Sequence, residues 1–465
     1  MARTLAALAL AVVWLPAVPA HAGRAARVSV TVTPAPHAGL PVTISGRVTG
    51  RVPTRLSARL QLRSRGRWTW ARVAPAPVRR RAFTLRWTLA PTGMPARVRV
   101  VVVRGRKPVA VSSSRKLTLA ATRGATSDAD CVTKSTLLSV GGDQDWSAER
   151  DLIVYSKPGN DGANQLHVIR PDGSGDTDIS SRAVAAGVRA DRHKTVPTWE
   201  PGGRWIVAQV ETADWYPGVD ERDVWLRERA INGVASSLWA VSPTGTRWVR
   251  LTTEAWPWSY GAMAAHFSRD GRQIVFSRLV EPAGFVPWGR YRLILADFRL
   301  APDGTPSLAN QRDVTPPGHV FAEAHGFSPA GTDVLFASYG ATDFANMDIW
   351  SLSLQTGATR RLTPSTLWDE HATYSPSGRR IVYFAGELGI APMTGDLMSM
   401  NPDGSDKRRL TAFNQPGAPG ATGEQTMVMR PTFSADGSRV AVTEQLTRDF
   451  PAHRRMSVVD LGSCG

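Results

Sequence analysis

The stretch Phe267-Ser268-Arg269-Asp270-Gly271, followed by the apolar run Gln273-Ile274-Val275-Phe276, contains the pattern that decides the fold. An aromatic residue and a serine precede an Asp-Gly pair, which favours a tight turn because glycine adopts positive φ without a steric penalty. The β-branched and aromatic residues that follow favour an extended strand. The stretch therefore predicts two antiparallel strands joined by a short turn.

The same pattern occurs six times between residues 131 and 465. The aromatic residues of successive copies are 53, 68, 60, 47 and 59 residues apart, whereas a four-stranded propeller blade needs about 40 to 45 residues. Most copies continue into a second hairpin whose turn also contains glycine, as at Pro402-Asp403-Gly404, and which often ends in Leu-Thr. The six copies begin at Trp146-Ser147, Trp199-Glu200, Phe267-Ser268, Phe327-Ser328, Tyr374-Ser375 and Phe433-Ser434.

This repeat resembles the TolB-type, WD40-like propeller repeat, and the resemblance covers essentially all of 131–465. It implies an all-β fold with a six-bladed β-propeller, in which each aromatic residue lies on the innermost strand of a blade. The partners of TolB are not implied, because TolB has a different N-terminal domain. In such a blade the two glycine turns lie on one face, and the long loops between the second and third strands lie on the other. Loop-rich faces commonly carry binding sites, and the long loops expected here are Glu211–Leu238, Leu279–Arg290, Tyr339–Met347, Phe384–Gly395 and Gln445–Arg454.

The sixth repeat lacks a fourth strand before the chain ends. We expect Ser135–Val140, which precedes the first repeat, to supply that strand and close the ring. Cys131 and Cys464 would then lie where the missing turn would be. In an oxidising compartment an even cysteine count favours one disulfide, and two free thiols are the alternative. A cross-link between these positions would stabilise the fold by roughly 4–5 kcal/mol in the chain-entropy model.

Residues 1–22 have the features of a secretory signal peptide. Arg3 supplies a positive charge, Leu5–Leu15 is a short apolar run, and Ala20-His21-Ala22 fits a cleavage site. The remaining sequence contains no apolar run of the ~18 residues that a transmembrane helix requires. We therefore expect a secreted or extracytoplasmic protein, and association with the cell surface is compatible with this.

Residues 23–120 differ in charge from the rest of the chain. They contain 21 Arg and Lys residues and no Asp or Glu, whereas residues 131–465 contain 33 basic and 37 acidic residues. Seven short β-type runs predict an immunoglobulin-like β-sandwich, joined by a linker at 121–130. The unbalanced arginines suggest an anionic wall polymer or anionic lipid as partner, and no nucleic-acid motif is present. A soluble cationic domain without such a partner is the alternative.

Three consecutive repeats place a histidine just before their aromatic residue: His266, His325 and His371. Glu323 and Glu370 lie four residues before theirs. Imidazole and carboxylate groups converging on one axis could bind a divalent metal ion. The arrangement is similar to that of the oligogalacturonate lyases, a propeller family that holds a metal with histidines from neighbouring blades. The alternative is that these residues only hydrogen-bond the chain where it enters each strand.

Other candidate ligand-binding residues lie on crossovers and insertions. Lys194 and Arg430 could fix an anionic ligand or balance the nearby carboxylates, and a solvated channel mouth is the alternative. Exposed aromatic residues suit sugar rings or peptides, although burial within the insertions explains them equally well. The aromatic candidates are Trp215, Tyr216, Trp256, Trp258 and Trp288.

The sequence contains no Gly-x-Ser-x-Gly elbow, His-Glu-x-x-His motif or phosphate-binding loop. The favoured hypothesis is therefore a non-catalytic binding or scaffold protein of the cell envelope, with a protein or glycan bound on the loop-rich propeller face. The second hypothesis is a metal-dependent, lyase-like propeller enzyme that degrades polysaccharide. No cofactor is expected apart from the possible metal ion.

Overall fold

The computed structural model describes most of the chain. Several predictions concern residues outside the described ones and stay as they are. These are the signal peptide, the linker, both cysteines and the five aromatic candidates on insertions and crossovers. The described residues are 26–33, 41–50, 53–64, 67–70, 75–88, 96–117, 132, 134–160, 162–212, 232–253, 261–281, 289–339, 347–365, 367–386, 394–421, 423–446 and 454–461.

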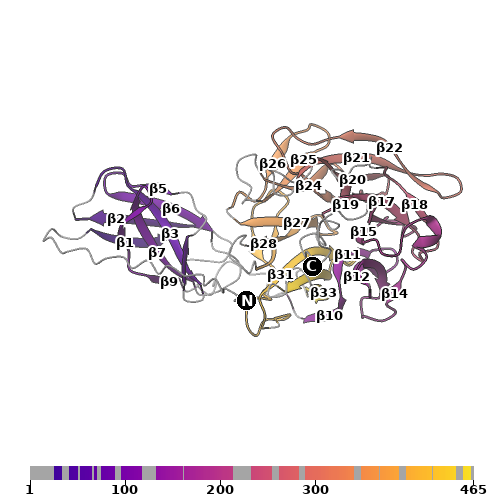
Figure 1. The fold of residues 1–465 in the computed structure, drawn as a ribbon, viewed down its shortest axis with the longest axis horizontal. Helices are drawn as coiled ribbons and strands as arrows, with labels where there is room; N and C mark the ends of the chain where they lie inside the picture. Colours follow the sequence, from indigo (N-terminus) through magenta and orange to yellow (C-terminus); the bar gives the residue numbers. More distant parts are fainter. Residues whose placement is uncertain are drawn as a thin grey trace, which may run out of the picture. The chain divides into compact units, whose positions relative to one another are not determined.

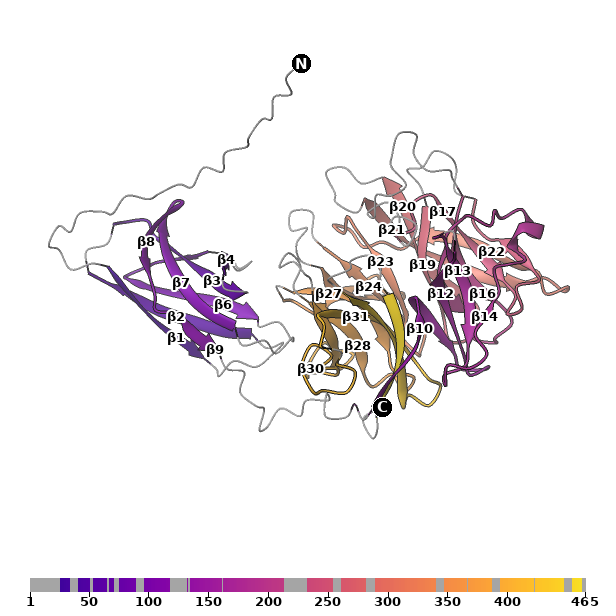
Figure 2. The ribbon, with the colours of Figure 1, turned by 60° about the horizontal axis from the view of Figure 1, so that its bottom comes forward.

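The chain forms two compact units, and both are built of β-strands (Figures 1 and 2). The first unit has a sheet in the order β1-β2-β6 and a sheet in the order β4-β3-β7-β8, with β5 on β3 and β9 on β7. Apolar residues of both sheets are buried, such as Ile44 and Phe83 in one and Leu60 and Val100 in the other. An immunoglobulin-like topology for this unit stays a prediction. The strands are β1 (Arg27–Thr33), β2 (Pro41–Thr49), β3 (Ser57–Ser64), β4 (Arg67–Trp70), β5 (Ala76–Pro77), β6 (Ala82–Thr88), β7 (Ala96–Arg104), β8 (Lys107–Val111) and β9 (Arg115–Leu117).

Strand β8 is not predicted from the sequence. It forms a hairpin with β7 through a turn at Gly105, which has a φ of 60°. The sequence pattern hides this strand because its first residues, Lys107 and Pro108, are not typical of a strand interior. Pro108 is tolerated because β8 lies at the end of the sheet path.

The second unit contains four antiparallel four-stranded sheets, each formed by four consecutive strands. In three of them the long insertion joins the second strand to the third, as predicted. The strands are β11 (Gly142–Ser147), β12 (Leu152–Pro158), β13 (Asn164–Ile169) and β14 (Thr177–Asp178); β15 (Lys194–Trp199), β16 (Ile206–Glu211), β17 (Ser236–Val241) and β18 (Trp248–Arg250); β19 (Gly261–Phe267), β20 (Gln273–Glu281), β21 (Arg290–Leu300) and β22 (Pro306–Asp313); and β23 (Glu323–Phe327), β24 (Asp333–Ser338), β25 (Asp348–Ser353) and β26 (Thr359–Arg361).

The last sheet combines the strands of the final two repeats with a strand from before the first. Its order is β10-β33-β32-β31-β29-β28-β27, with β30 paired to β29. Strand β10 pairs antiparallel with β33, from Lys134↔Asp460 to Val140↔Arg455, and Figure 2 shows it in purple beside yellow strands. The prediction that Ser135–Val140 completes the sixth repeat is confirmed. The strands are β10 (Lys134–Val140), β27 (Trp368–Tyr374), β28 (Ile381–Gly386), β29 (Gly395–Met400), β30 (Arg408–Arg409), β31 (Thr426–Phe433), β32 (Arg439–Leu446) and β33 (Arg454–Asp460).

The first strands of the six repeats contact one another in sequence. Strand β11 contacts β15, and β15 contacts β19 (Figure 1). The series continues through β23, β27 and β31 until β31 contacts β11 again. Every one of these strands is interrupted by a β-bulge. A bulge bends a strand and leaves some of its backbone N–H and C=O groups without partners in the neighbouring strand. These groups lie on the first strands, where successive repeats contact one another.

The repeated serine and threonine residues of the sequence pattern satisfy backbone groups. In the first turn, Ser268 Oγ accepts the amide of Gln273 at 2.9 Å, and Glu200 replaces this serine in the second repeat by accepting the amide of Arg204 at 3.1 Å. In the Leu-Thr motif, the hydroxyl accepts an amide of the third strand. The pairs are Thr252 with Leu238 (3.0 Å), Thr363 with Ile349 (2.8 Å) and Thr411 with Leu397 (2.9 Å).

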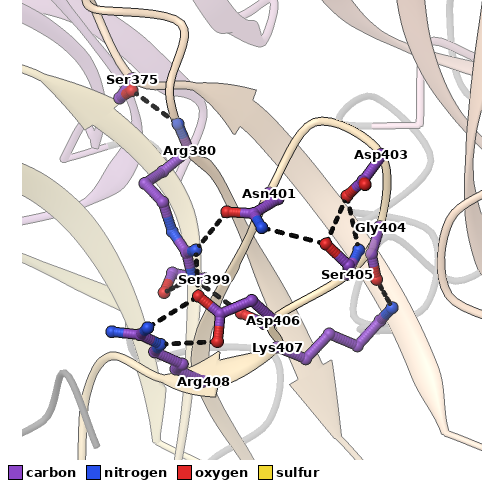
Figure 3. Close-up of polar contacts among 10 residues, drawn as sticks. All are labelled: Ser375, Arg380, Ser399, Asn401, Asp403, Gly404, Ser405, Asp406, Lys407 and Arg408. Carbon is purple, nitrogen blue, oxygen red and sulfur yellow. Dashed lines mark hydrogen bonds and ion pairs between the residues drawn. The ribbon is translucent and has the colours of Figure 1, made fainter. Parts of the chain in front are cut away.

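The two glycine turns of the fifth repeat lie together, as predicted for one face of a blade. Arg380, which follows the first turn, donates from Nη1 to Asn401 Oδ1 (2.7 Å) and to Asp406 Oδ2 (2.9 Å). Figure 3 shows this guanidinium spanning to the second turn, where Asp403 Oδ1 accepts the amide of Ser405. Arginine suits the position because its planar fork can serve several acceptors at once.

The junction between the first and last repeats uses the same contacts as the junctions within the unit. Thr443 Oγ1 on β32 accepts the amide of Asp143 in the bulge of β11 at 2.9 Å. At two other junctions, Gln209 Oε1 accepts the amide of Ala264 (2.9 Å) and Ser277 Oγ accepts that of Ala324 (2.8 Å). The polar side chain of one repeat thus satisfies a backbone amide in the next, and the chain's two ends join in the same way.

Replacing Thr443 with valine should weaken this junction. The buried hydroxyl also donates to Gln144 Oε1 at 2.7 Å, so its loss leaves two buried polar groups without their partner and should lower the free energy of unfolding by about 1–3 kcal/mol. Urea denaturation would measure the change, with Thr244→Val at an exposed position as control. Equal midpoints for the two variants would show that the Thr443 hydroxyl contributes nothing to stability.

Candidate functional site

The bulges place one residue of most first strands in a left-handed backbone conformation. Non-glycine residues in this region cost on the order of 1–3 kcal/mol, and they cluster at functional sites. Each of these residues lies three positions before the aromatic residue of its repeat. They are Asp143 (φ 54°), Val196 (φ 46°), Ala264 (φ 51°), His371 (φ 54°) and Arg430 (φ 52°).

Strands β23 and β27 bring two carboxyl groups and one imidazole together. Glu323, Glu370 and His371 each offer one ligand atom, and these three atoms lie within 4.8 Å of one another. The distance from His371 Nε2 to Glu370 Oε2 is 3.9 Å, and Glu370 Oε2 accepts a hydrogen bond from Trp368 Nε1 at 2.9 Å. We call Glu323, Glu370 and His371, with the neighbouring His325 and His266, the axial cluster.

His325 extends the cluster from the bulge of β23. Its ring centroid lies 5.9 Å from that of His371, in an edge-to-face arrangement. The atoms His325 Nε2 and His371 Nδ1 are buried and have no hydrogen-bond partner among the described residues. Buried polar atoms normally have partners, so these two nitrogens indicate a place for a ligand. His266 differs, because it hydrogen-bonds the backbone of Ala324.

Arg430 supplies positive charge at the edge of the cluster. Its Nε lies 2.8 Å from Asp143 Oδ1, and its Nη2 lies 3.9 Å from Glu323 Oε1. The other oxygen of Asp143 lies 2.9 Å from Arg454 Nη1. Asp143 therefore holds two guanidinium groups in place, and one of them faces the cluster's carboxyl groups.

Burial sets the protonation states of the cluster. Burial and the negative charge of Glu370 raise the pKa of Glu323 well above its ordinary value, while Arg430 acts in the opposite direction. Burial lowers the pKa of His266 to about 4 and holds the pKa values of His325 and His371 well below the ordinary value, with a further contribution from Arg430. The imidazoles are therefore neutral at pH 7, which is the form that binds metal ions.

The donor set fits a divalent transition metal. Imidazole nitrogen and carboxylate oxygen are the usual ligands of zinc, and they also suit iron and manganese. Three protein ligands leave at least one coordination position open, which is typical of sites where a metal meets substrate or ligand. A metal ion would also offset the like charges of Glu323 and Glu370.

Six of the predicted site residues are thus close in space: His266, His325, His371, Glu323, Glu370 and Arg430. Lys194 is buried on β15, where its ammonium donates to Gln165 Oε1 and to the carbonyl of Arg192, both at 2.9 Å, and to that of Ala190 at 3.2 Å. The ammonium of Lys194 therefore donates its hydrogen bonds to acceptors of the protein itself. A role for Lys194 in ligand binding stays a prediction.

Asp143 and Arg454 belong to the site but are not among the predicted residues. The sequence does contain a signal for Asp143. It lies three residues before Trp146, as His371 lies three before Tyr374 and Arg430 three before Phe433. Aligning the repeats on the third residue before the aromatic would have identified it. Arg454 has no such signal, since it begins β33 directly after an insertion.

No helix long and apolar enough to cross a membrane occurs in the part of the chain that the structure describes. No family model matches the chain, and no curated protein matches it either.

Several solved structures are similar to this one at low sequence identity. A putative TolB from Agrobacterium tumefaciens is 17% identical with a TM-score of 0.42, over 62% of this chain and 79% of that one. Kuenenia stuttgartiensis hydrazine synthase is 12% identical with a TM-score of 0.31, over 88% and 48% of the two chains. An ancestral GH74 enzyme is 10% identical with a TM-score of 0.39, over 90% and 55%. The latter two alignments span about half of those proteins, and at these values the comparisons assign the chain to no family.

Replacing Arg430 with methionine should raise the pKa of His266 from about 4, because the guanidinium disfavours a second positive charge nearby. Arg430→Lys keeps the charge and should leave this pKa low. NMR titration of the imidazole protons would measure both variants. An unchanged pKa in Arg430→Met would show that burial alone sets the protonation state.

Proposed function

We propose that this chain is an exported, six-bladed β-propeller protein that binds a divalent metal ion at its axis and, through that ion, an oxygen-donor ligand. The observation that carries the proposal is the axial cluster. Donor atoms of Glu323, Glu370 and His371 lie within 4.8 Å of one another, beside two buried imidazole nitrogens without partners among the described residues.

The six-bladed architecture is supported by the contacts of the first strands. They form a closed series of neighbours from β11 back to β11, and each strand carries a bulge at the corresponding place. A closed propeller brings these bulges around one axis. This explains how residues from β11, β19, β23, β27 and β31 come to interact.

The ligand we propose is a protein or glycan of the cell envelope. A metal ion at the cluster would supply Lewis acidity to a carboxylate or hydroxyl oxygen. Arg430 would orient an anionic group there, because one of its nitrogens faces Glu323 rather than Asp143. The insertions between second and third strands would provide the wider binding face. Export rests on the signal-peptide pattern of residues 1–22.

A second candidate function is metal-dependent cleavage of an acidic polysaccharide. The observation that favours it is His325, whose depressed pKa keeps the ring neutral and whose buried Nε2 has no hydrogen-bond partner in the described ranges. Such a nitrogen could accept a proton from a substrate carbon next to a carboxylate. The electron pair left on that carbon would form a C=C bond as the neighbouring glycosidic C–O bond breaks, and the leaving oxygen would take up a proton to become a hydroxyl. Unsaturated products from polygalacturonate, lost in His325→Ala, would support this candidate, and their absence would favour the non-catalytic role.

Metal binding can be tested on the full-length protein. We expect one zinc or manganese ion per chain after dialysis against the metal, measured by inductively coupled plasma mass spectrometry. His371→Ala and Glu370→Gln should each reduce affinity by more than the ~10–100-fold caused by losing an outer-shell partner. His167→Ala, on β13, is the control. The proposal would be contradicted if the control variant lost metal while His371→Ala and Glu370→Gln kept it. It would also be contradicted if neither the parent protein nor any variant bound stoichiometric metal.

Metal affinity should depend on pH through Glu323. The raised pKa of this group means that it carries a proton well above its ordinary range, and that proton must leave before the oxygen can bind a metal. Affinity should therefore rise with pH and become constant above the raised pKa, with about one proton released per metal below it. Calorimetry in two buffers of different ionisation enthalpy would measure the release. An affinity independent of pH would exclude Glu323 as a ligand.

A further inference from the structure

The first unit presents tryptophan and arginine side chains on one face of its larger sheet. Along β3, Leu60 is buried, while Arg59 and Gln61 are partly exposed on the opposite face. Gln61 pairs with Trp70 of β4 on one side and with Arg99 of β7 on the other. Because paired residues share a face, Trp70, Gln61 and Arg99 form a row across three strands. We call Arg59, Gln61, Trp68, Trp70 and Arg99 the Arg–Trp face.

The arginines of this face stack on the indole rings. Arg59 Cζ lies 4.4 Å from the centroid of Trp70, and Arg99 Cζ lies 4.2 Å from that of Trp68. Arg99 Nε also donates to Gln61 Oε1 at 2.8 Å. Stacking holds a guanidinium in a fixed plane while its remaining edge donors stay available. The face is therefore ordered before any partner binds.

These guanidinium groups have no anionic partner within their own unit. Residues 23–120 contain no Asp or Glu at all, so no arginine there can form an intra-unit ion pair with an acidic side chain. Protein surfaces usually intersperse charges of both signs, and a one-sided arrangement attracts polyanions. The missing negative charges would come from a bound molecule.

We infer that the Arg–Trp face binds an extended anionic polysaccharide, one that carries carboxylates on its sugar rings. Trp70 is 41% exposed and offers a flat apolar surface that suits a sugar ring. Arg59 and Arg99 offer in-plane donors that match a carboxylate with two hydrogen bonds. This inference concerns a second site and does not depend on metal binding by the propeller.

The composition of the face favours a polysaccharide over a membrane. Among the described residues of this unit, Trp70 and Val111 are the exposed large hydrophobic residues. Both lie on strands rather than on a loop that could enter a bilayer, and surface helices or lipid chains are the usual means of such insertion. A nucleic acid would use the same charges, but its affinity would come chiefly from phosphate contacts spread over the whole basic unit.

The test uses full-length protein and polygalacturonate as the probe, with its fully methyl-esterified form as the uncharged control. The protein should bind the first and not the second, and binding should weaken as salt is added. Arg59→Gln/Arg99→Gln should lower affinity at least about tenfold, because each charged hydrogen bond is worth roughly a tenfold change or more. The matched double variant Arg79→Gln/Arg106→Gln removes the same charge from exposed positions outside the face and should lower affinity much less.

The aromatic contribution is tested separately. Trp70→Ala should lower affinity for polygalacturonate several-fold, whereas Trp70→Phe should retain most of it because a ring remains for stacking. Thermal midpoints equal to that of the parent would show that both variants are folded. Equal losses in the two double arginine variants would overturn the inference, as would full affinity in Trp70→Ala. Tighter binding to phosphatidylglycerol vesicles or single-stranded DNA than to polygalacturonate at equal salt would also overturn it.

Discussion

The second unit depends on closing a ring of sheets whose first strands are all irregular. Each bulge removes backbone groups from the strand ladder, and buried amides without partners are costly. At three of the junctions the preceding repeat supplies the missing acceptor, from Gln209, Ser277 or Thr443. At the last junction this acceptor comes from β32 and the amide from β11, near the opposite end of the unit. Pairing of β10 with β33 brings these ends together. The ring must therefore close for the bulge amide of β11 to find its hydrogen-bond acceptor.

The same irregularity creates the axial cluster. Regular strands would alternate side chains between two faces, and neighbouring strands would then present only every second residue to the axis. The bulges instead turn residues such as His371 and Arg430 through a left-handed conformation. Histidines at different distances from their aromatic residues can therefore meet. The strain is tolerated because the inter-repeat hydrogen bonds fix the backbone around it.

Much of the fold could be predicted because the repeated residues meet local needs of the backbone in each hairpin. Asp-Gly turns, the serine after each aromatic residue and the Leu-Thr ending each satisfy specific backbone groups, so their recurrence reveals the strands. The closing strand could also be predicted, because the sixth repeat lacks one. Asp143 could have been found by aligning the repeats on the third residue before the aromatic. Arg454 could not, because its role depends on Asp143, which lies 311 residues earlier in the chain. The hairpin of β7 and β8 was missed because Lys107 and Pro108 resemble a loop.

The two candidate sites treat charge in opposite ways, and this difference follows from their surroundings. In the axial cluster, burial makes unbalanced charge expensive, so the pKa of Glu323 is raised well above its ordinary value and Asp143 is matched by Arg430 and Arg454. A cation that binds there through Glu323 must displace a proton at any pH below that raised pKa. In the first unit, water screens the arginines and the acid-free sequence leaves them unmatched. Such exposed charges repel one another less strongly than buried ones would, and they favour long polyanions because many weak contacts then act together.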